Sequence, residues 1–211
     1  MSSTPDPRAV RRLAVVVARY SAAPGTPPGI DPAAFARSCL ADTYEVLAGL
    51  TEVDAGIVGP ADVAELLWPG DRRWPARLGL LDLASALADE ADEVVFVPGD
   101  VPDLPELVVA KVFKALRHAD VAIAPERRGD GCAAIGVRLP VADWLRGSDL
   151  DLDLNPAMAL APIAPHRTSC AVTPDWHRMR RPEAVHRLDP ALEGWEETRA
   201  LLSGAPLGLA D

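Results

Sequence analysis

Short apolar runs alternate with longer amphipathic stretches along most of the chain. The first run, Leu13–Ala18, contains three consecutive valines and is flanked by arginines. Further runs occupy residues 53–58, 94–97, 121–124 and 132–139, with a last short one at 170–172. Runs of this kind are typical of strands buried on both faces, and they predict a sheet of about six or seven strands.

Helical periodicity fills the intervals between these runs. After Pro32, the residues Leu40, Tyr44 and Leu47 recur at the spacing of one helix face, which predicts a helix up to about residue 50. Further helices are predicted at residues 60–68, 78–91, 104–118, 182–188 and 190–202. Asp71–Trp74 is predicted to be a charged loop. Ser148–Asp153 alternates acids with leucines, which suits either a short edge strand or an exposed loop.

The order of these elements predicts the fold class. A strand, a helix and a second strand in succession form a parallel pair. The Gly-rich turn Gly129–Gly131 joins the runs at 121–124 and 132–139 directly, so this pair is expected to be antiparallel. We therefore expect an α/β protein, a three-layer α/β/α sandwich with a mostly parallel sheet and an antiparallel member.

Length and charge limit the domain organisation and the partners. The 211 residues, 49% of them hydrophobic, suit one α/β domain at 12–190, between a disordered tail at 1–11 and a C-terminal helix and tail at 191–211. The formal net charge of −10 argues against a nucleic-acid partner, because phosphate backbones are held by excess Lys and Arg.

Cysteine usage and hydropathy bear on the location of the protein. Cys39, Cys132 and Cys170 show no metal-ligand spacing, which favours buried, reduced thiols in a cytoplasmic protein. No apolar run reaches the roughly 18 to 20 residues that cross a bilayer, and no secretion signal is recognisable. No membrane partner is therefore expected.

Two carboxylates follow the third apolar run, within a segment rich in proline. Asp100 and Asp103 come just after residues 94–97, at the expected carboxyl end of a buried strand. Ligands of open α/β sheets bind at this end, so these acids are candidates for holding a divalent metal and a phosphorylated substrate. Alternatively, Asp103 caps the following helix and Asp100 completes a turn.

Several motifs around these acids carry a family resemblance. They are Gly99-Asp100-Val101-Pro102-Asp103-Leu104-Pro105, Ala124-Pro125-Glu126, the turn at 129–131, and Ile135-Gly136-Val137-Arg138. Together they resemble the GT-A-like nucleotidyltransferases and glycosyltransferases. Within that superfamily they resemble the uncharacterised bacterial glycosyltransferase-A-like proteins and the 2-phospholactate guanylyltransferases. The resemblance covers about residues 12–190.

The resemblance implies a function and a set of site residues. Asp100 would hold Mg²⁺ or Mn²⁺ against the phosphates of a nucleotide or nucleotide sugar, with Asp103 as its catalytic neighbour. Gly129, Asp130 and Gly131 would lie near the nucleotide or a small-molecule acceptor, although a plain hairpin turn explains them too. A carboxylate-bound metal would neutralise the charge that develops on the leaving phosphate.

The sequence departs from the family in its closing motif. In the stretch from Pro174 to Val185, Trp176, Pro182 and Glu183 match the family pattern, but its two acids correspond to Arg178 and Arg180. One of those acids ordinarily supplies the second metal carboxylate, and a guanidinium cannot ligate a cation. The resemblance therefore implies a metal site that has lost a ligand, which makes the metal cofactor doubtful.

The first loop also departs from the family. Its relatives carry lysines and arginines there to bind phosphates, whereas Arg19–Asp31 keeps Pro24 and Gly25 but holds no Lys or Arg after Arg19. Arg19 is then the candidate phosphate contact of this loop, beside whatever backbone N–H groups the prolines leave free.

Three interpretations of the arginines stay open. Arg178, Arg180 and Arg181 could replace the metal as fixed cations that bind phosphate. The fold could instead persist as an inactive pseudoenzyme with a binding or scaffold role. In the third interpretation these arginines are a solvated face before a helix. An active protein would be a nucleotidyl or glycosyl transferase, a homodimer being one possible assembly.

Two weaker groups of residues remain. His177 could accept a proton from an attacking hydroxyl, or be a histidine without a catalytic role. Asp149, Asp151 and Asp153 could form a secondary cation site, or be a hydrated acidic run.

Overall fold

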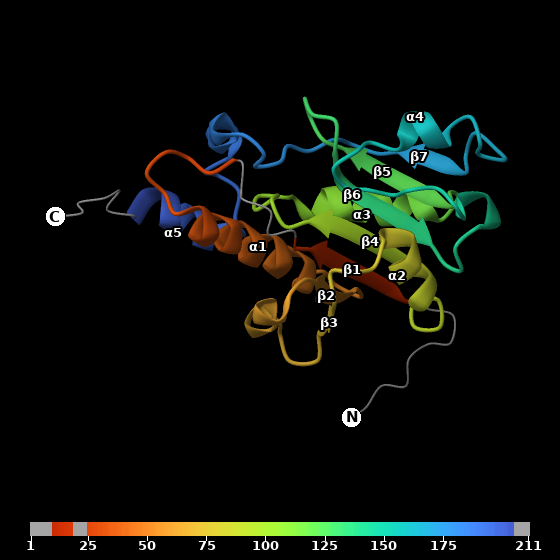
Figure 1. The fold of residues 1–211 in the computed structure, drawn as a ribbon, viewed down its shortest axis with the longest axis horizontal. Helices are drawn as coiled ribbons and strands as arrows, with labels where there is room; N and C mark the ends of the chain where they lie inside the picture. The colour runs from red at the N-terminus through yellow and green to blue at the C-terminus, as the bar shows by residue number, and fades with distance from the viewer. Residues whose placement is uncertain (1–9, 19–24, 205–211) are drawn as a thin grey trace.

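A mixed sheet forms the centre of the protein (Figure 1). The structure is a computed structural model, and it describes residues 10–18 and 25–204. In these residues seven strands occur in the spatial order β3-β2-β1-β4-β6-β5-β7. Their bounds are β1 Arg12–Val17, β2 Asp54–Val58, β3 Arg72–Trp74, β4 Glu93–Pro98, β5 Val121–Pro125, β6 Cys132–Arg138 and β7 Cys170–Val172.

Strand β6 is antiparallel to both of its neighbours, and the other pairs of the sheet are parallel. The direct turn from β5 to β6 causes this reversal, because a short turn returns the chain beside the strand it has just left. The predicted fold class, a mostly parallel α/β sheet with an antiparallel member, is confirmed.

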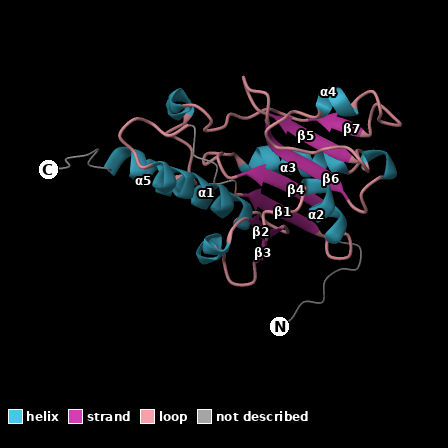
Figure 2. Cartoon of the chain, viewed as in Figure 1, coloured by secondary structure: helices cyan, strands magenta, loops and turns pink. Residues whose placement is uncertain are grey.

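Helices cover both faces of the sheet (Figure 2). The helices α1 (Pro32–Ala48) and α3 (Glu106–Leu116) pack on one face, and α2 (Leu80–Ala86) packs on the other. The remaining elements are α4 (Ala157–Leu160), α5 (Glu196–Gly204) and 3-10 helices at Ala61–Leu66, Asp143–Leu145 and Pro182–Arg187. Among the described residues, no helix is both long and apolar enough to cross a membrane.

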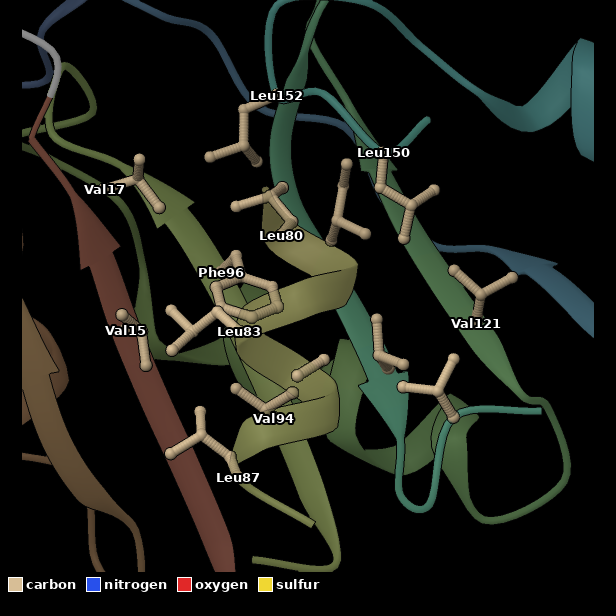
Figure 3. Packing of buried hydrophobic residues seen from close by; sticks show 14 of the residues in the cluster. Val15, Val17, Leu80, Leu83, Leu87, Val94, Phe96, Val121, Leu150 and Leu152 are labelled. Carbon is tan, nitrogen blue, oxygen red and sulfur yellow. The ribbon is translucent and has the colours of Figure 1, made fainter. Parts of the chain in front are cut away.

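The central strands are buried on both faces, as the continuous apolar runs predict. Val15 and Phe96 point to the α2 side, where they pack with Leu83 (Figure 3). Val16 and Val97 point the other way, into the core under α1 and α3. Since side chains alternate along a strand, a run without polar positions requires a covering layer on each side.

The prediction of a charged loop at Asp71–Trp74 is wrong. Arg72–Trp74 forms β3, which pairs in parallel with β2 at the edge of the sheet. A Cβ on Gly56 would lie 2.5 Å from the Trp74 ring, so the missing side chain of Gly56 is what lets Trp74 cover β2. A strand of three residues with two exposed arginines is too short to show the alternation of apolar and polar residues by which a strand is recognised in a sequence.

Several predicted helices are shorter in the structure. The helix expected at 78–91 is α2, which ends at Ala86, and the one expected at 190–202 begins only at Glu196. The stretches at 60–68 and 182–188 contain 3-10 helices. Tight turns with local hydrogen bonds have the same apolar spacing as one turn of α-helix, so periodicity alone does not separate them.

The segment 148–153 is a loop, but its leucines are not exposed. Leu150 and Leu152 are 3% and 1% exposed and reach the α2 side of the core near Leu80 (Figure 3). The N–H of Cys132 donates to the carbonyl of Leu152 at 2.8 Å, which ties this loop to the start of β6. The loop therefore brings Asp153 close to the end of the sheet at which β6 begins.

Asp42 fastens α5 to α1. Its carboxylate lies within α1 and accepts the backbone N–H groups of Glu197 and Thr198 at 3.0 and 2.7 Å, at the first turn of α5. The residue is fully buried, and burial raises the pKa of Asp42 from its ordinary 3.8 to about 6, against the hydrogen bonds, which lower it. Ionisation of this group therefore opposes folding.

We expect the stability conferred by Asp42 to fall as the pH rises. Because its pKa is higher in the folded protein, its contribution is fully present below about pH 4 and is lost as the pH passes about 6. Relative to Asp42→Asn, the wild type should lose free energy of unfolding over this interval, as measured by urea denaturation. The exposed Asp62, replaced by Asn, is the matched control. A constant difference between wild type and Asp42→Asn would contradict the expectation.

Candidate functional site

Three strands of the sheet present functional groups at one edge. Asp100 follows the end of β4, Glu126 follows the end of β5, and Cys132 begins β6. Since β6 runs antiparallel to the other two, its start lies at the same edge as their ends. This is the carboxyl edge of the parallel strands, where ligands of open α/β sheets bind.

Arg178 meets Asp100 at this edge. The Nε of Arg178 donates to Oδ1 of Asp100 at 2.8 Å, and Nη2 donates to Oδ2 at 3.0 Å. Nη2 also donates to Oδ1 of Asp153 at 3.0 Å. The guanidinium thus bridges two carboxylates that arrive from different segments of the chain. The sequence could place Asp100 and Arg178 together only through the family resemblance, and the structure shows that they are in contact.

The guanidinium of Arg178 is buried and fully hydrogen-bonded. Its side chain is 5% exposed, and Nη1 donates to the backbone carbonyls of Leu152 and Cys132 at 2.6 and 3.3 Å. With the three bonds to carboxylates, all five N–H groups of a guanidinium are used. Burial lowers the pKa of Arg178. The neighbouring carboxylates, chiefly Asp100 and then Asp153, together raise it by more than burial lowers it, so the pKa lies above its ordinary value.

The burial of Arg178 contradicts the interpretation that all these arginines are a solvated face. Only Arg181 is exposed, whereas Arg180 is half-buried. A buried arginine with five partners is an integral part of the site, because removing it would leave several acceptors unpaired.

Arg180 forms a second, more open pair beside Arg178. Its Nη1 donates to Oε2 of Glu126 at 3.3 Å, and its Nη2 lies 3.9 Å from Oδ1 of Asp153. The Arg180 side chain is 34% exposed. These five side chains, which we call the charged cluster, are Asp100, Glu126, Asp153, Arg178 and Arg180. The cluster contains three carboxylates and two guanidinium groups.

The Gly-rich turn is both a hairpin and a wall of the charged cluster. A Cβ on Gly131 would lie 2.9 Å from Nη1 of both Arg178 and Arg180, so a glycine is needed for their close approach. The N–H of Gly131 donates to Oε2 of Glu126 at 3.3 Å. Gly129 packs against the Glu126 side chain, and Asp130 is exposed, with its carbonyl accepting the Asn155 N–H at 2.5 Å.

The described end of the first loop also reaches this region. Gly25 is buried, and a Cβ there would lie 2.0 Å from the Met179 carbonyl oxygen. The N–H of Met179 in turn donates to the Asp100 carbonyl at 2.8 Å. The loop that keeps the family's Pro-Gly pair therefore contacts the closing motif. Arg19, the candidate phosphate contact, lies outside the described residues.

Asp103 contacts Trp176 and His177, which are not members of the charged cluster. It is 2% exposed, and its Oδ1 accepts the Trp176 Nε1–H at 3.2 Å. The Nε2 of the buried His177 lies 3.1 Å from the same oxygen, without the angle of a hydrogen bond. The helix cap at α3 is Pro105, with no side-chain hydrogen bond, so Asp103 does not cap that helix. Asp103 instead holds the segment that presents Arg178.

Comparison with solved structures identifies the fold. The chain matches an inferred nucleotide-diphospho-sugar transferase from Desulfovibrio desulfuricans G20 with a TM-score of 0.64 and 21% identity, over 92% of this chain and 97% of that one. The chain has the GT-A-like fold of the nucleotide-diphospho-sugar transferases. No protein-family model matches the sequence, and a search of curated proteins finds no relative.

Two further solved structures share this fold with the chain. The 4-diphosphocytidyl-2C-methyl-D-erythritol synthase of Anaerococcus prevotii matches with a TM-score of 0.55 and 13% identity, over 83% of this chain and 95% of that one. A CMP:2-keto-3-deoxy-manno-octonic acid synthetase in complex with CTP matches with a TM-score of 0.53 and 12% identity, over 83% and 96%.

The charged cluster does not fit a divalent metal. Both carboxylate oxygens of Asp100 accept hydrogen bonds from Arg178, so Mg²⁺ or Mn²⁺ bound to Asp100 would have to share these oxygens with the arginine. In the part of the chain that the structure describes, no three Asp, Glu, His or Cys side chains are arranged to hold a metal. A guanidinium in contact with the same oxygens would also repel the metal.

Glu126 is the member of the cluster that sequence reasoning missed as a site residue. In the sequence it stands out only as part of a motif, although it comes just after a predicted strand, as Asp100 does. Position after a buried strand is therefore the signal that could have found it. Asp153, which the sequence offers only for a secondary cation site, joins the cluster through a loop without periodicity.

Proposed function

We propose that this GT-A-like protein binds a nucleotide or nucleotide sugar through its phosphates, without a divalent metal, and transfers part of it to a small-molecule acceptor. One observation carries the proposal: the buried Arg178 places a fixed positive charge against Asp100 at the carboxyl edge of the sheet. The match to transferase and nucleotidyltransferase structures supports the same edge as the ligand site.

Arg180 is the proposed phosphate contact. It is the more exposed guanidinium of the cluster and uses one N–H on Glu126, whereas Arg178 has used all five. Guanidinium groups bind phosphate oxygens through paired hydrogen bonds. Arg178 does not bind the phosphate directly. It is a buried, fixed positive charge that stabilises negative charge on the leaving phosphate. Arg19 and the turn at 129–131 remain proposed as further contacts of the ligand.

The two acids take different roles in this proposal. Asp100 keeps one third of its side chain accessible, 31%, and is the proposed catalytic carboxylate that faces the substrate. Asp103 is buried against Trp176 and His177, so it is a positioning residue. In transfer, the acceptor hydroxyl oxygen forms the new bond and gives its proton to the Asp100 carboxylate, while the phosphate leaves with the electron pair of the broken bond.

A second candidate is an inactive GT-A-like protein with a binding or scaffold role. The charge balance of the cluster favours it, because three carboxylates face two guanidinium groups and Arg178 has no N–H left for a ligand. A phosphate would then meet a surface with one excess negative charge, which disfavours binding.

Calorimetric titration with GTP, CTP and a UDP-sugar separates the candidates. We expect one of these ligands to bind without Mg²⁺, and Arg180→Ala to weaken its binding about 10- to 100-fold, the range for a lost charge-assisted hydrogen bond. Arg146→Ala, which breaks an exposed pair with Asp143, is the control and should leave the affinity unchanged. Binding that requires Mg²⁺ and disappears in Asp100→Asn would reject the metal-free site. Absence of binding by all three ligands would favour the scaffold protein.

A further inference from the structure

We propose that the Arg178 guanidinium is a built-in replacement for a divalent cation between Asp100 and Asp153, and that it keeps metal ions out of the site. Replacing Arg178 by aspartate would then create a divalent-metal site at the same place. This inference deepens the proposed function and rests on it for the choice of site. Its test uses the metal alone and needs no nucleotide.

The carboxylates converge on Arg178 as they would on a cation. Asp100 arrives from the end of β4 and Asp153 from the loop before α4, and both point at one guanidinium. Mg²⁺ and Mn²⁺ prefer carboxylate oxygens as ligands. The oxygens that would form the metal's first coordination sphere are therefore already turned toward one positive charge.

Two backbone carbonyls help the carboxylates to hold Arg178 in this position. Nη1 donates to the carbonyls of Leu152 and Cys132, which belong to the buried loop and to β6. A metal that displaced the guanidinium would remove one donor from each carbonyl, leaving that of Leu152 with the Cys132 N–H, and would have to expel a buried charge. A tethered cation also competes intramolecularly, so a free ion in solution is at a disadvantage.

Arg178→Asp would change the site in the direction of a metal. It removes the positive charge and adds a carboxylate, so that Asp100 and Asp153 gain a third acidic ligand and Glu126 lies nearby. Arg178→Lys keeps a positive charge with fewer donors and is the matched control. Arg127→Ala removes an arginine from an exposed ion pair outside the cluster and controls for general surface charge.

Electron paramagnetic resonance of Mn²⁺, titrated into the full chain without nucleotide, tests the inference. We expect no Asp100-dependent Mn²⁺ binding by the wild type, Arg178→Lys or Arg127→Ala. Arg178→Asp should bind one Mn²⁺ at least about 100-fold more tightly than the wild type, since a repelling charge becomes an attracting one. The added variant Asp100→Asn should abolish this binding, and Mg²⁺ should compete for it.

Thermal unfolding keeps the inference testable if Arg178→Asp folds poorly. Mn²⁺ should raise the melting temperature of Arg178→Asp, by roughly 2–4 °C per 1 kcal/mol of binding for a chain of this size, and should not raise that of the wild type. Tight Mn²⁺ binding by the wild type that Asp100→Asn abolishes would overturn the inference. It would also be overturned if Mn²⁺ neither bound to Arg178→Asp nor raised its melting temperature. Failure of nucleotide binding alone would count against the proposed function and leave this inference standing.

Discussion

Replacing Arg178 by methionine is expected to lower the free energy of unfolding by about 3–5 kcal/mol, the range for breaking a buried ion pair from one side. Methionine keeps much of the length of the side chain but offers no donors to Asp100, Asp153 or the two backbone carbonyls. The two carboxylates are about one third exposed, so water can partly solvate them, which places the effect toward the lower end of that range.

Chemical denaturation of four chains measures this effect and assigns it to the pair. The chains are the wild type, Arg178→Met, Asp100→Asn and the double variant. Since the two side chains share two hydrogen bonds, the double variant should be more stable than the sum of the single effects predicts, by about 1–3 kcal/mol. Additive effects would show that Arg178 stabilises the fold independently of Asp100.

An exposed ion pair provides the comparison for this experiment. Arg127 and Asp175 are in contact at 2.9 Å, but their side chains are 46% and 47% exposed. Exposed pairs contribute about 0–1 kcal/mol and exposed cation–π contacts about 0.5–1 kcal/mol, so Arg127→Ala, which also removes a contact with the Trp176 ring, should have the smaller effect. If Arg127→Ala and Arg178→Met had equal effects, burial would not explain the stability that Arg178 confers.

The sheet could be predicted from the sequence because its central strands are buried on both faces. Residues 13–17 and 94–97 are apolar without interruption, and this pattern has few alternatives in a short segment. The edge strand β3 and the shortened helix α2 could not be predicted, because their bounds depend on tertiary contacts. Trp74 packs in the space left by Gly56, which precedes it by 18 residues in the chain.

Part of the family resemblance has a structural rather than a functional basis. A Cβ on Gly136 would lie 2.5 Å from Val112, so the glycine of the Ile-Gly-Val-Arg motif lets α3 pack closely on β6. Arg138 of the same motif pairs with Asp120 at the opposite end of β5 from the charged cluster. This motif therefore reports the fold and says little about the substrate.

The candidate site could be predicted only in outline. The position of Asp100 after a buried strand indicates that it lies at the carboxyl end of the sheet, and the resemblance connects it with Arg178. Which carboxylates surround an arginine depends on loop conformation, and the loop at 148–153 has no periodicity that fixes it. Nothing in the sequence indicates that the partner of Asp103 is Trp176, which lies 73 residues further along the chain.

Replacing Phe96 by alanine is expected to lower the free energy of unfolding by about 3–5 kcal/mol, the usual range for a large aromatic residue in a core. Phe96 lies in β4 between β1 and β6, is fully buried, and packs under α2 near Leu83 (Figure 3). Because β4 also leads to Asp100, loss of this side chain affects the strand that carries the candidate site.

Urea denaturation of Phe96→Ala checks this expectation, with Leu107→Ala as the control. Leu107 lies in α3 but is 64% exposed, so its truncation should change the free energy of unfolding by less than about 0.5 kcal/mol. The central strands are covered on both faces, so water cannot fill the cavity that the missing ring would leave. The adjacent strands are rigid and limit how far the neighbouring side chains can move into it. A loss below about 1 kcal/mol for Phe96→Ala would mean that the core closes around the missing ring and that β4 is not the rigid centre from which Asp100 is positioned.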